Sequence, residues 1–334
     1  MPAVGNTYLT LADVMKRKDP NNQVAQIIEM LAQDNPILED ANALPCNDGT
    51  THLTTVRTGI PAPTWRMLYQ GVQPTKSTTA QVRDATGMAE AWSEIDSKLV
   101  ALSEDAAGLR LSEAAAFLEG MNQDMATTLF YGDQTTAPAK FTGLTPRFNS
   151  LAAPSGGQIV DALGTGSTNT SVWFVGWSPQ SCHLLFPKGS QAGITREDKG
   201  QQTKTNSDGS VLDVHREKFC WDIGLSVRDW RYISRVANID VSALKIDAAT
   251  GANLFDNMVK AYWRLKRHKI MGGKFAIYAN ATVMEYLDQQ ARRANSNTYL
   301  SWKEGAGDAG PVLTFRGMPI RQCDALLNTE ARVV

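Results

Sequence analysis

The sequence has few of the features that mark membrane, secreted or disulfide-rich proteins. Its 334 residues include only four cysteines, which lie far apart and form no CxxC pair, so neither a disulfide framework nor a cysteine-based zinc site is expected. No apolar run reaches 18 residues, which argues against a transmembrane helix and a membrane partner. The first residues lack the basic start and apolar core of a signal peptide. We therefore expect synthesis and residence in a reducing cytoplasm.

An excess of charge of one sign is also missing. The chain carries 33 Lys and Arg against 34 Asp and Glu, a formal net charge of -1, so no global basic field attracts it to nucleic acid. Hydrophobic residues make up 43% and charged residues 20%, which is an ordinary globular balance. The length is sufficient for two or three domains with their own cores.

Recognisable catalytic and ligand-binding patterns are absent as well. The four histidines show no metal-ligand spacing. Cys182 and His183 are adjacent, but neighbouring residues on a strand point to opposite faces and cannot act as nucleophile and base. The segment at 71–77 resembles a phosphate-binding loop, yet it lacks a glycine before Lys76 and carries Pro74 where backbone donors are needed. We therefore predict no catalytic, cofactor-binding or metal-binding residues, no cofactor, and no enzyme activity.

The strongest positive signal is a long helix. Apolar residues at steps of three and four predict a helix over 112–131, with Ser112 as N-cap and Gly132 as a left-handed C-terminal stop. A rod of about 20 residues is roughly 30 Å long and can act as the spine of a layered domain. Its buried face is predicted to contain Leu111, Ala115, Leu118, Asn122, Met125 and Leu129.

The residues before this spine helix predict three other elements. Residues 1–45 form an arm with an amphipathic helix whose apolar face includes Ile27, Ile28 and Leu31. Residues 46–92 contain two strand-like segments that are poor in large aliphatics, which favours a projecting hairpin resting on another surface, with a long surface loop as the alternative. Residues 93–109 predict a helix that breaks beside Gly108, where the apolar phase slips.

The second half of the chain changes from strands to mixed structure. Residues 171–239 predict strands, with a hairpin turn at Asp208-Gly209 and breaks at Asp222 and Gly224. Residues 250–334 alternate helices with short strands, which indicates an α+β unit. A basic run at 264–269 includes Arg264 and Arg267. We interpret it as a solvated helix face, a subunit contact or a weak contact with DNA phosphate.

Several short motifs occur in an order that resembles a known family. They are Leu129–Asp133 with Phe141–Leu144, Gly224–Tyr232, Arg235 with Asn238–Asp240, Phe315–Ile320 and Asp324–Leu326. Together they resemble the major capsid proteins of short-tailed double-stranded DNA bacteriophages of the epsilon-fifteen-like type. That resemblance covers most of the chain and implies the Hong Kong 97-type capsid fold, which is α+β.

The resemblance also implies a division of the chain and a mechanical function. The expected parts are an N-terminal arm (1–45), an extended loop (46–92), a peripheral domain with the spine helix (93–240), and an axial domain with return strands (241–334). Copies would form pentamers and hexamers of an icosahedral virion capsid around packaged double-stranded DNA, assembled in the bacterial host cytoplasm. Implied partners are a separate scaffolding protein, a portal protein, a decoration or cementing protein, and non-specifically bound DNA.

A structural shell protein needs contact residues rather than an active site. The predicted subunit-interface residues are Ile27, Ile28, Leu31, Trp65, Arg66, Lys76, Arg83, Arg264 and Arg267. Two alternatives remain open from the sequence: the shell of a bacterial nanocompartment with the same fold, and a soluble α+β enzyme with an unrecognised site. A shell predicts very large particles or capsomers, whereas an enzyme predicts a small oligomer.

Overall fold

A computed structural model describes residues 9–10, 13, 32–103, 105–245, 253–265, 272–293, 300–303 and 312–334. The helices are α2 (Ile37–Asp40), α3 (Ser97–Leu102), α4 (Ala106–Tyr131), α5 (Leu254–Arg264) and α6 (Ala281–Arg293), with short 3-10 turns η1 (Thr145–Phe148), η2 (Pro154–Gln158), η3 (Trp230–Tyr232) and η4 (Val241–Ala243). The strands are β1 (Ala43–Pro45), β2 (Thr51–Gly59), β3 (Thr78–Asp96), β4 (Ile159–Asp161), β5 (Asn169–Trp177), β6 (Cys182–Phe186), β7 (Thr195–Thr205), β8 (Val211–Val227), β9 (Ile233–Asp240), β10 (Lys274–Ala279), β11 (Leu300–Lys303), β12 (Val312–Phe315) and β13 (Met318–Gln322).

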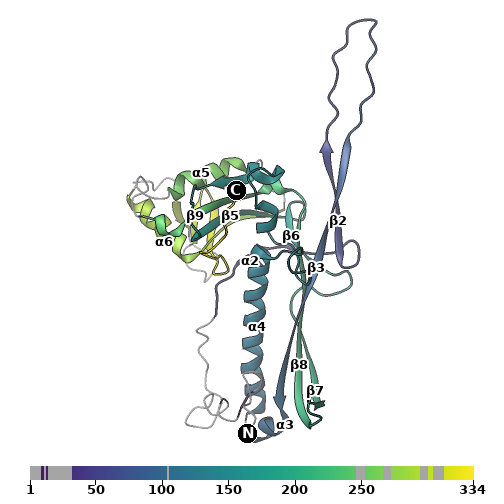
Figure 1. Ribbon diagram of the computed structural model, residues 1–334, viewed down its shortest axis with the longest axis vertical. Coiled ribbons are helices and arrows are strands. Elements are labelled where there is room, and N and C mark those ends of the chain that lie inside the picture. The colour runs from purple at the N-terminus through teal and green to yellow at the C-terminus, as the bar shows by residue number, and fades with distance from the viewer. Residues whose placement is uncertain are drawn as a thin grey trace.

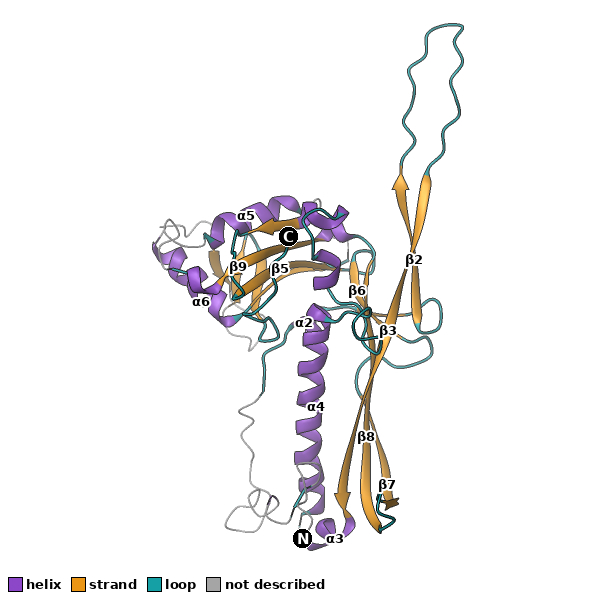
Figure 2. Cartoon of the chain, viewed as in Figure 1, coloured by secondary structure: helices purple, strands orange, loops and turns teal. Residues whose placement is uncertain are grey.

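The molecule has a compact body and two long extensions (Figure 1). In the body, α5 and α6 lie beside the sheet that contains β5 and β9, while α4 runs away from it next to a ribbon of β3, β7 and β8 (Figure 2). The β2–β3 hairpin points in the opposite direction and extends well past the body. This arrangement confirms the prediction of a projecting hairpin and leaves its outer half with no contact to the body.

One hydrogen-bonded strand order connects the body to the ribbon. It runs β11-β12-β13-β10-β5-β6-β8-β3-β2, with β9 beside β5, β4 beside β9, β7 beside β8 and β1 beside β6. The body and ribbon halves are joined at one position, where Trp177 of β5 pairs with Cys182 of β6. The two halves are therefore separate sheets in practice, linked by a narrow junction.

The core lies on both faces of β5, in which every residue is buried. Alternate side chains of a strand point to opposite faces, so Trp173, Val175 and Trp177 pack toward the end of α4. Val172 and Phe174 face the other way, toward α5 and α6. A strand covered on both sides reads as a continuous apolar run, which is why SVWFVGW indicates a strand without showing an alternating pattern.

A buried ionic cluster ties the C-terminal segment to this core. Arg235 on β9 donates from Nη2 to Glu330 Oε2 at 2.9 Å and from Nη1 to the Phe148 carbonyl at 2.7 Å. Glu330 also accepts from the Tyr131 hydroxyl at 2.5 Å and from Ser171. Both partners of the ion pair are almost inaccessible, at 1% and 3% side-chain exposure. The last turn of α4, strand β9 and the chain end are therefore held at one point.

The spine helix starts earlier than its predicted first residue, Ser112. It spans Ala106–Tyr131, and the Asp105 side chain caps it by accepting from the Gly108 N–H at 2.7 Å. Ser112 lies inside the helix, where its hydroxyl donates to the Leu109 carbonyl. The predicted break beside Gly108 is also wrong, because the interruption falls between α3 and α4. Residues 93–96 belong to β3 and not to a helix.

The cap assignment gives a direct test on stability. Asp105→Ala should lower the free energy of unfolding by about 1 kcal/mol, because it removes an N-cap acceptor. Ser112→Ala is the matched control and should cost much less, since alanine is the best helix former. Chemical denaturation of both variants measures the difference. Equal losses, or a larger loss for Ser112→Ala, would contradict the assignment.

The buried face of α4 is rotated from the predicted one by about one residue. Met125 and Leu129 are buried as expected, but Leu111 is 62% exposed, and Ala115 and Leu118 are exposed too. The first half of the helix packs against α3 through Leu109 and against the ribbon through Ala114 and Met121. Its last turns enter the body and are buried nearly all round. A single apolar stripe therefore cannot describe both halves.

Gly132 ends the helix, but for a different reason from the predicted one. Its φ is −55°, outside the left-handed region. A Cβ on this residue would lie 2.5 Å from the Phe141 carbonyl oxygen and 2.6 Å from that of Thr128. Glycine is required here because two backbone segments approach closely.

Other predictions for the second half are mostly confirmed. The Asp208-Gly209 turn joins β7 to β8, with Gly209 at φ +84°. The C-terminal unit has the predicted helices and strands, and the described part of the first helix ends at Arg264. The breaks at Asp222 and Gly224 are wrong, because β8 runs without interruption from Val211 to Val227. The division of the chain into domains stays a prediction, and β3 crosses the boundary placed at residue 93.

Candidate subunit interface

The projecting hairpin is the most unusual surface of the molecule. β2 and the first part of β3 pair antiparallel from Thr51–Ala85 to Gly59–Thr78. Threonine and valine dominate these strands, and such β-branched residues suit a pleated ribbon. Beyond this pairing, residues 60–77 form an exposed loop. The strands thus act as a stalk that carries the loop away from the body.

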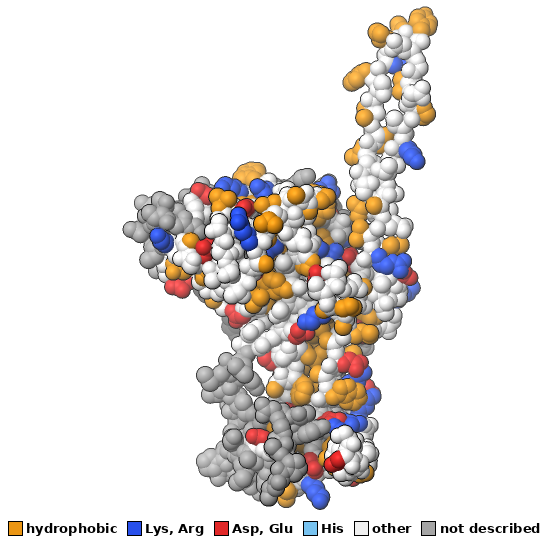
Figure 3. Space-filling model, in the orientation of Figure 1, with side chains coloured by type: hydrophobic (Ala, Val, Ile, Leu, Met, Phe, Trp, Pro, Cys, Tyr) orange, Lys and Arg blue, Asp and Glu red, His pale blue; other side chains and the backbone are white. Residues whose placement is uncertain are grey.

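The loop displays large apolar side chains to solvent. Trp65 is 99% exposed, and Ile60, Met67, Leu68 and Tyr69 are also among the most exposed hydrophobic residues of the described chain. Figure 3 shows these hydrophobic atoms along the outer hairpin, far from the body. Contiguous exposed apolar surface on a soluble protein usually marks a contact site. We name residues 60–77 the hairpin tip.

The charge of the hairpin is of one sign. No Asp or Glu occurs between Asp48 and Asp84, whereas Arg57, Arg66 and Lys76 all lie in this segment. At the base, Arg83 forms an exposed ion pair with Asp48 at 3.3 Å. Within the tip, Arg66 donates from Nη1 to the Gln70 carbonyl at 3.4 Å. The outer hairpin is therefore both apolar and cationic, and a complementary surface would be apolar with carboxylates nearby.

A groove with that character runs between α4 and β3. Its floor is formed by Ala89, Ala91, Ala116, Phe117, Gly120 and Met121, and its volume is about 400 Å³. Glu90, Glu113 and Asp124 line the edge. Glu90 pairs with Lys218 and Asp124 with Lys140, and all four of these side chains are at least 25% exposed. We name it the spine groove.

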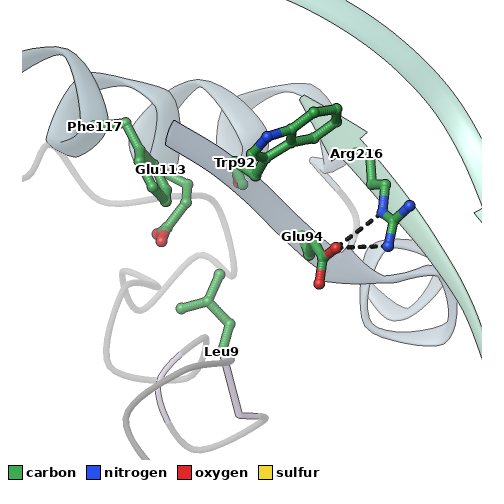
Figure 4. Close-up of a pocket in the computed structure, with 7 residues that line it drawn as sticks. Leu9, Trp92, Glu94, Glu113, Phe117 and Arg216 are labelled. Carbon is green, nitrogen blue, oxygen red and sulfur yellow. Dashed lines mark hydrogen bonds and ion pairs between the residues drawn. The ribbon is translucent and has the colours of Figure 1, made fainter. Parts of the chain in front are cut away.

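The spine groove continues into a second hollow near the start of α4 (Figure 4). Phe117 and Glu113 line both, and Leu9, Trp92, Glu94 and Arg216 complete the second one. Burial raises the pKa of Glu94, but Lys204 and Arg216 outweigh this and hold it below its usual range. Glu94 is therefore an ionised carboxylate locked in ion pairs, as the dashed contacts to Arg216 show. It is unsuited to proton transfer at neutral pH.

The comparisons with known proteins can be set against this geometry. A family model described as major capsid protein GP7 matches residues 19–334. The chain belongs to this major capsid protein family. A solved structure of bacteriophage epsilon15 is 39% identical, covers 100% of this chain and 99% of that chain, and has a TM-score of 0.81. The comparison with curated proteins finds no match.

A second solved structure supports the fold alone. A chain of the bacteriophage JBD30 capsid is 10% identical, covers 90% of this chain and 95% of that chain, and has a TM-score of 0.52. The predicted α+β Hong Kong 97-type capsid fold is confirmed. This major capsid protein is a structural shell subunit of a phage virion and not an enzyme, which removes the enzyme alternative.

The structure places the predicted interface residues of this major capsid protein in different regions. Trp65, Arg66 and Lys76 lie together on the hairpin tip, and Arg83 lies at the hairpin base. Arg264 is exposed at the end of α5, in the body. The remaining four residues lie outside the described residues: Ile27, Ile28, Leu31 and Arg267. The role of all nine residues as subunit contacts stays a prediction.

Sequence reasoning missed most of the apolar tip. Met67, Leu68 and Tyr69 follow Trp65 and Arg66, and the segment is bounded by Pro63 and Gly71. An apolar run inside a proline- and glycine-rich loop belongs to no strand or helix that could bury it. That feature of the sequence indicates an exposed apolar surface. The predicted shortage of large aliphatics concerns the two strand-like segments and does not extend to the loop between them.

The residues considered for chemistry prove to be structural. Cys182 lies in the core, and burial raises the pKa of its thiol, while His183 packs against His52 on another strand. Within the described ranges, no three His, Cys, Asp or Glu side chains come together as a metal site requires. No described helix is long and apolar enough to cross a membrane.

Proposed function

We propose that copies of this chain form pentamers and hexamers that close into an icosahedral shell around packaged double-stranded DNA. The observation that carries this proposal is the hairpin tip, whose apolar side chains lie beyond the reach of the chain's own body. Full burial of a large aliphatic or aromatic side chain stabilises by about 1.5–3 kcal/mol. A neighbouring copy supplies that burial, and closed symmetry repeats the same contact around each ring.

The spine groove is the best acceptor for the tip on a neighbouring copy. Its alanine, phenylalanine and methionine floor matches the apolar tip, and the carboxylates at its edge match Arg66 and Lys76. The ion pairs already present at that edge are exposed and therefore weak, so an incoming guanidinium can compete for the carboxylates. Charge complementarity of this kind favours specificity and rapid association.

Further partners follow from the same proposal. A separate scaffolding protein would guide assembly in the bacterial host cytoplasm, a portal protein would occupy one vertex, and a decoration or cementing protein would reinforce the surface. Arg264 is exposed beside Trp263, and we propose that this end of α5 makes a non-specific contact either with packaged DNA phosphate or with a neighbouring copy.

Mass and imaging of the purified full chain test the proposal. With rising protein concentration, native mass measurement should show species of five and six copies, and negative-stain microscopy should show closed particles in the megadalton range. Scaffold-dependent assembly would stop at the five- and six-copy rings, which also supports the proposal. A chain that remains monomeric or dimeric at every concentration would contradict it.

A further inference from the structure

Four polar side chains form a cluster at the base of the hairpin. His52 on β2 pairs in register with Asp84 on β3, and Ser226 on β8 pairs with His183 on β6. These strands are adjacent in the order β6-β8-β3-β2. The exposed fractions of the four residues are 7%, 5%, 0% and 0%. Such a polar cluster is unexpected in a buried layer, where apolar side chains are the rule.

The cluster lies where the hairpin joins the rest of the molecule. β3 pairs with β2 as far as Ala85 and with β8 from Thr86 onward, so the sheet changes partners one step beyond Asp84. Among the described strands, β2 pairs only with β3. The His52 ring packs edge-on against the His183 ring, with centroids 5.5 Å apart. This ring contact joins β2 to β6, two strands that do not pair with each other.

The two imidazoles lack hydrogen-bond partners. No ring nitrogen of His52 or His183 has a partner among the described residues, although a neutral imidazole has one donor and one acceptor. Asp84 is already engaged: it accepts from Arg147 Nη2 at 2.8 Å and from the Ser226 hydroxyl at 2.9 Å. The buried rings therefore pack against each other, while the Asp84 carboxylate is bonded to Arg147 and Ser226 and not to either ring.

The charges facing the rings oppose protonation. Asp84 from β3 is the one carboxylate that acts on both rings, and Arg147 from η1 neutralises it. Arg228, just after β8, acts on both rings as a like charge. Burial first, and then Arg228, lower the pKa of His52, while burial, the neighbouring His52 and Arg228 lower that of His183 to about 4. The Asp84 carboxylate and the Ser178 backbone favour protonation of His183 but are outweighed. The Cys182 thiol, next along β6, packs into the core instead.

We propose that the His52–His183 contact is a pH-sensitive joint, which holds the base of the hairpin against β6 at neutral pH and releases it when an imidazole gains a proton. The open joint binds protons more readily than the closed one. The closed state is therefore fully favoured above the ordinary histidine pKa of about 6.5 and loses its advantage as the pH falls from there toward about 4. The joint lies within one chain, so the proposal holds whether or not the chain forms a shell.

Hydrogen–deuterium exchange of the unassembled full chain tests the joint. Protection of the β2 amides is measured relative to α4, which removes the intrinsic pH dependence of exchange. Between about pH 7.5 and about pH 5 the relative protection of β2 should fall roughly tenfold or more, because protonation favours the open joint. Unchanged relative protection would overturn the proposal.

Substitution of the pair separates titration from packing. His52→Phe with His183→Phe keeps two edge-on rings without a titratable nitrogen, and its relative protection should change less than about twofold. His215→Phe, at the far end of β8, is the matched control and should keep the full response. A response that persists in the double variant overturns the proposal. If the double variant does not fold, His52→Gln replaces it as the test. The fall in relative β2 protection between about pH 7.5 and about pH 5 should then shrink at least about threefold, and an unchanged fall would overturn the proposal.

Discussion

A chain in which Asn-Gly replaces residues 60–77 is expected to fold normally and to form no closed shell. Gly59 and Thr78 are register partners, and a two-residue Asn-Gly turn connects such partners without strain. The removed residues belong to none of the core clusters, so the body should keep its stability. The deletion weakens the contact with a neighbouring copy instead, because it removes several side chains whose burial would each stabilise that contact by about 1.5–3 kcal/mol.

The measurement combines thermal unfolding with particle imaging. Unfolding of the shortened chain should stay within a few degrees of the full chain, since about 1 kcal/mol shifts the midpoint by roughly 2–4 °C at this size. A full-length variant with Trp65→Ser, Leu68→Ser and Tyr69→Ser tests whether the apolar side chains or the loop length matter, and it should assemble equally poorly. Normal particles from the shortened chain would show that the tip is not an assembly contact.

Arg235→Met should produce the largest loss of stability from a single substitution. It leaves Glu330 buried at 3% side-chain exposure without its cation, and removal of one partner of a buried ion pair costs about 3–5 kcal/mol. The aromatic contact is lost as well, because the Arg235 guanidinium lies 4.9 Å from the Trp173 ring centroid. Urea denaturation of the unassembled chain measures the change.

Two further variants locate the origin of that loss. Arg231→Met removes the ion pair with Asp229, whose arginine is 41% exposed, and should cost at most about 1 kcal/mol. Glu330→Leu added to Arg235→Met should restore much of the stability, because an apolar pair of similar volume replaces the ion pair. If Arg235→Met proved as mild as Arg231→Met, the cluster would not be what holds the C-terminal segment.

The predictable parts of the fold are those governed by local rules. The Asp208-Gly209 turn, the helix near Leu254 and Met258, and the projecting hairpin follow from turn chemistry, periodicity and a shortage of apolar residues. The start of α4 did not follow from them. Ser112 was the predicted cap, but the observed cap is Asp105, seven residues earlier. The added turn packs Leu109 against Ile95 and Leu99, and no local rule in the sequence indicates that contact.

The candidate interface was harder to predict because a contact with another molecule produces no periodic pattern of apolar residues in the sequence. Trp65 and Arg66 were identified through the resemblance to capsid proteins. Leu68 and Tyr69 are of the same residue types as core residues, and only their place in a loop, outside any strand or helix, distinguishes them. The predicted break at Gly224 is wrong because the glycine has a packing role. Glycine suggests a turn, yet a Cβ there would lie 2.7 Å from the Ala85 carbonyl oxygen, so Gly224 allows the close approach of β3 to β8.

The continuity of β3 has a mechanical consequence. Its 19 residues span about 60 Å at about 3.3 Å per residue, from the edge of the tip to Asp96, which caps α3. A pull on the tip acts along the strand axis, so the bonds of the β3–β8 ladder are sheared together rather than opened one by one. Tension from a neighbouring subunit would thus be carried the length of the molecule to the base of the spine helix, and internal pressure on one subunit would load the next through a single strand.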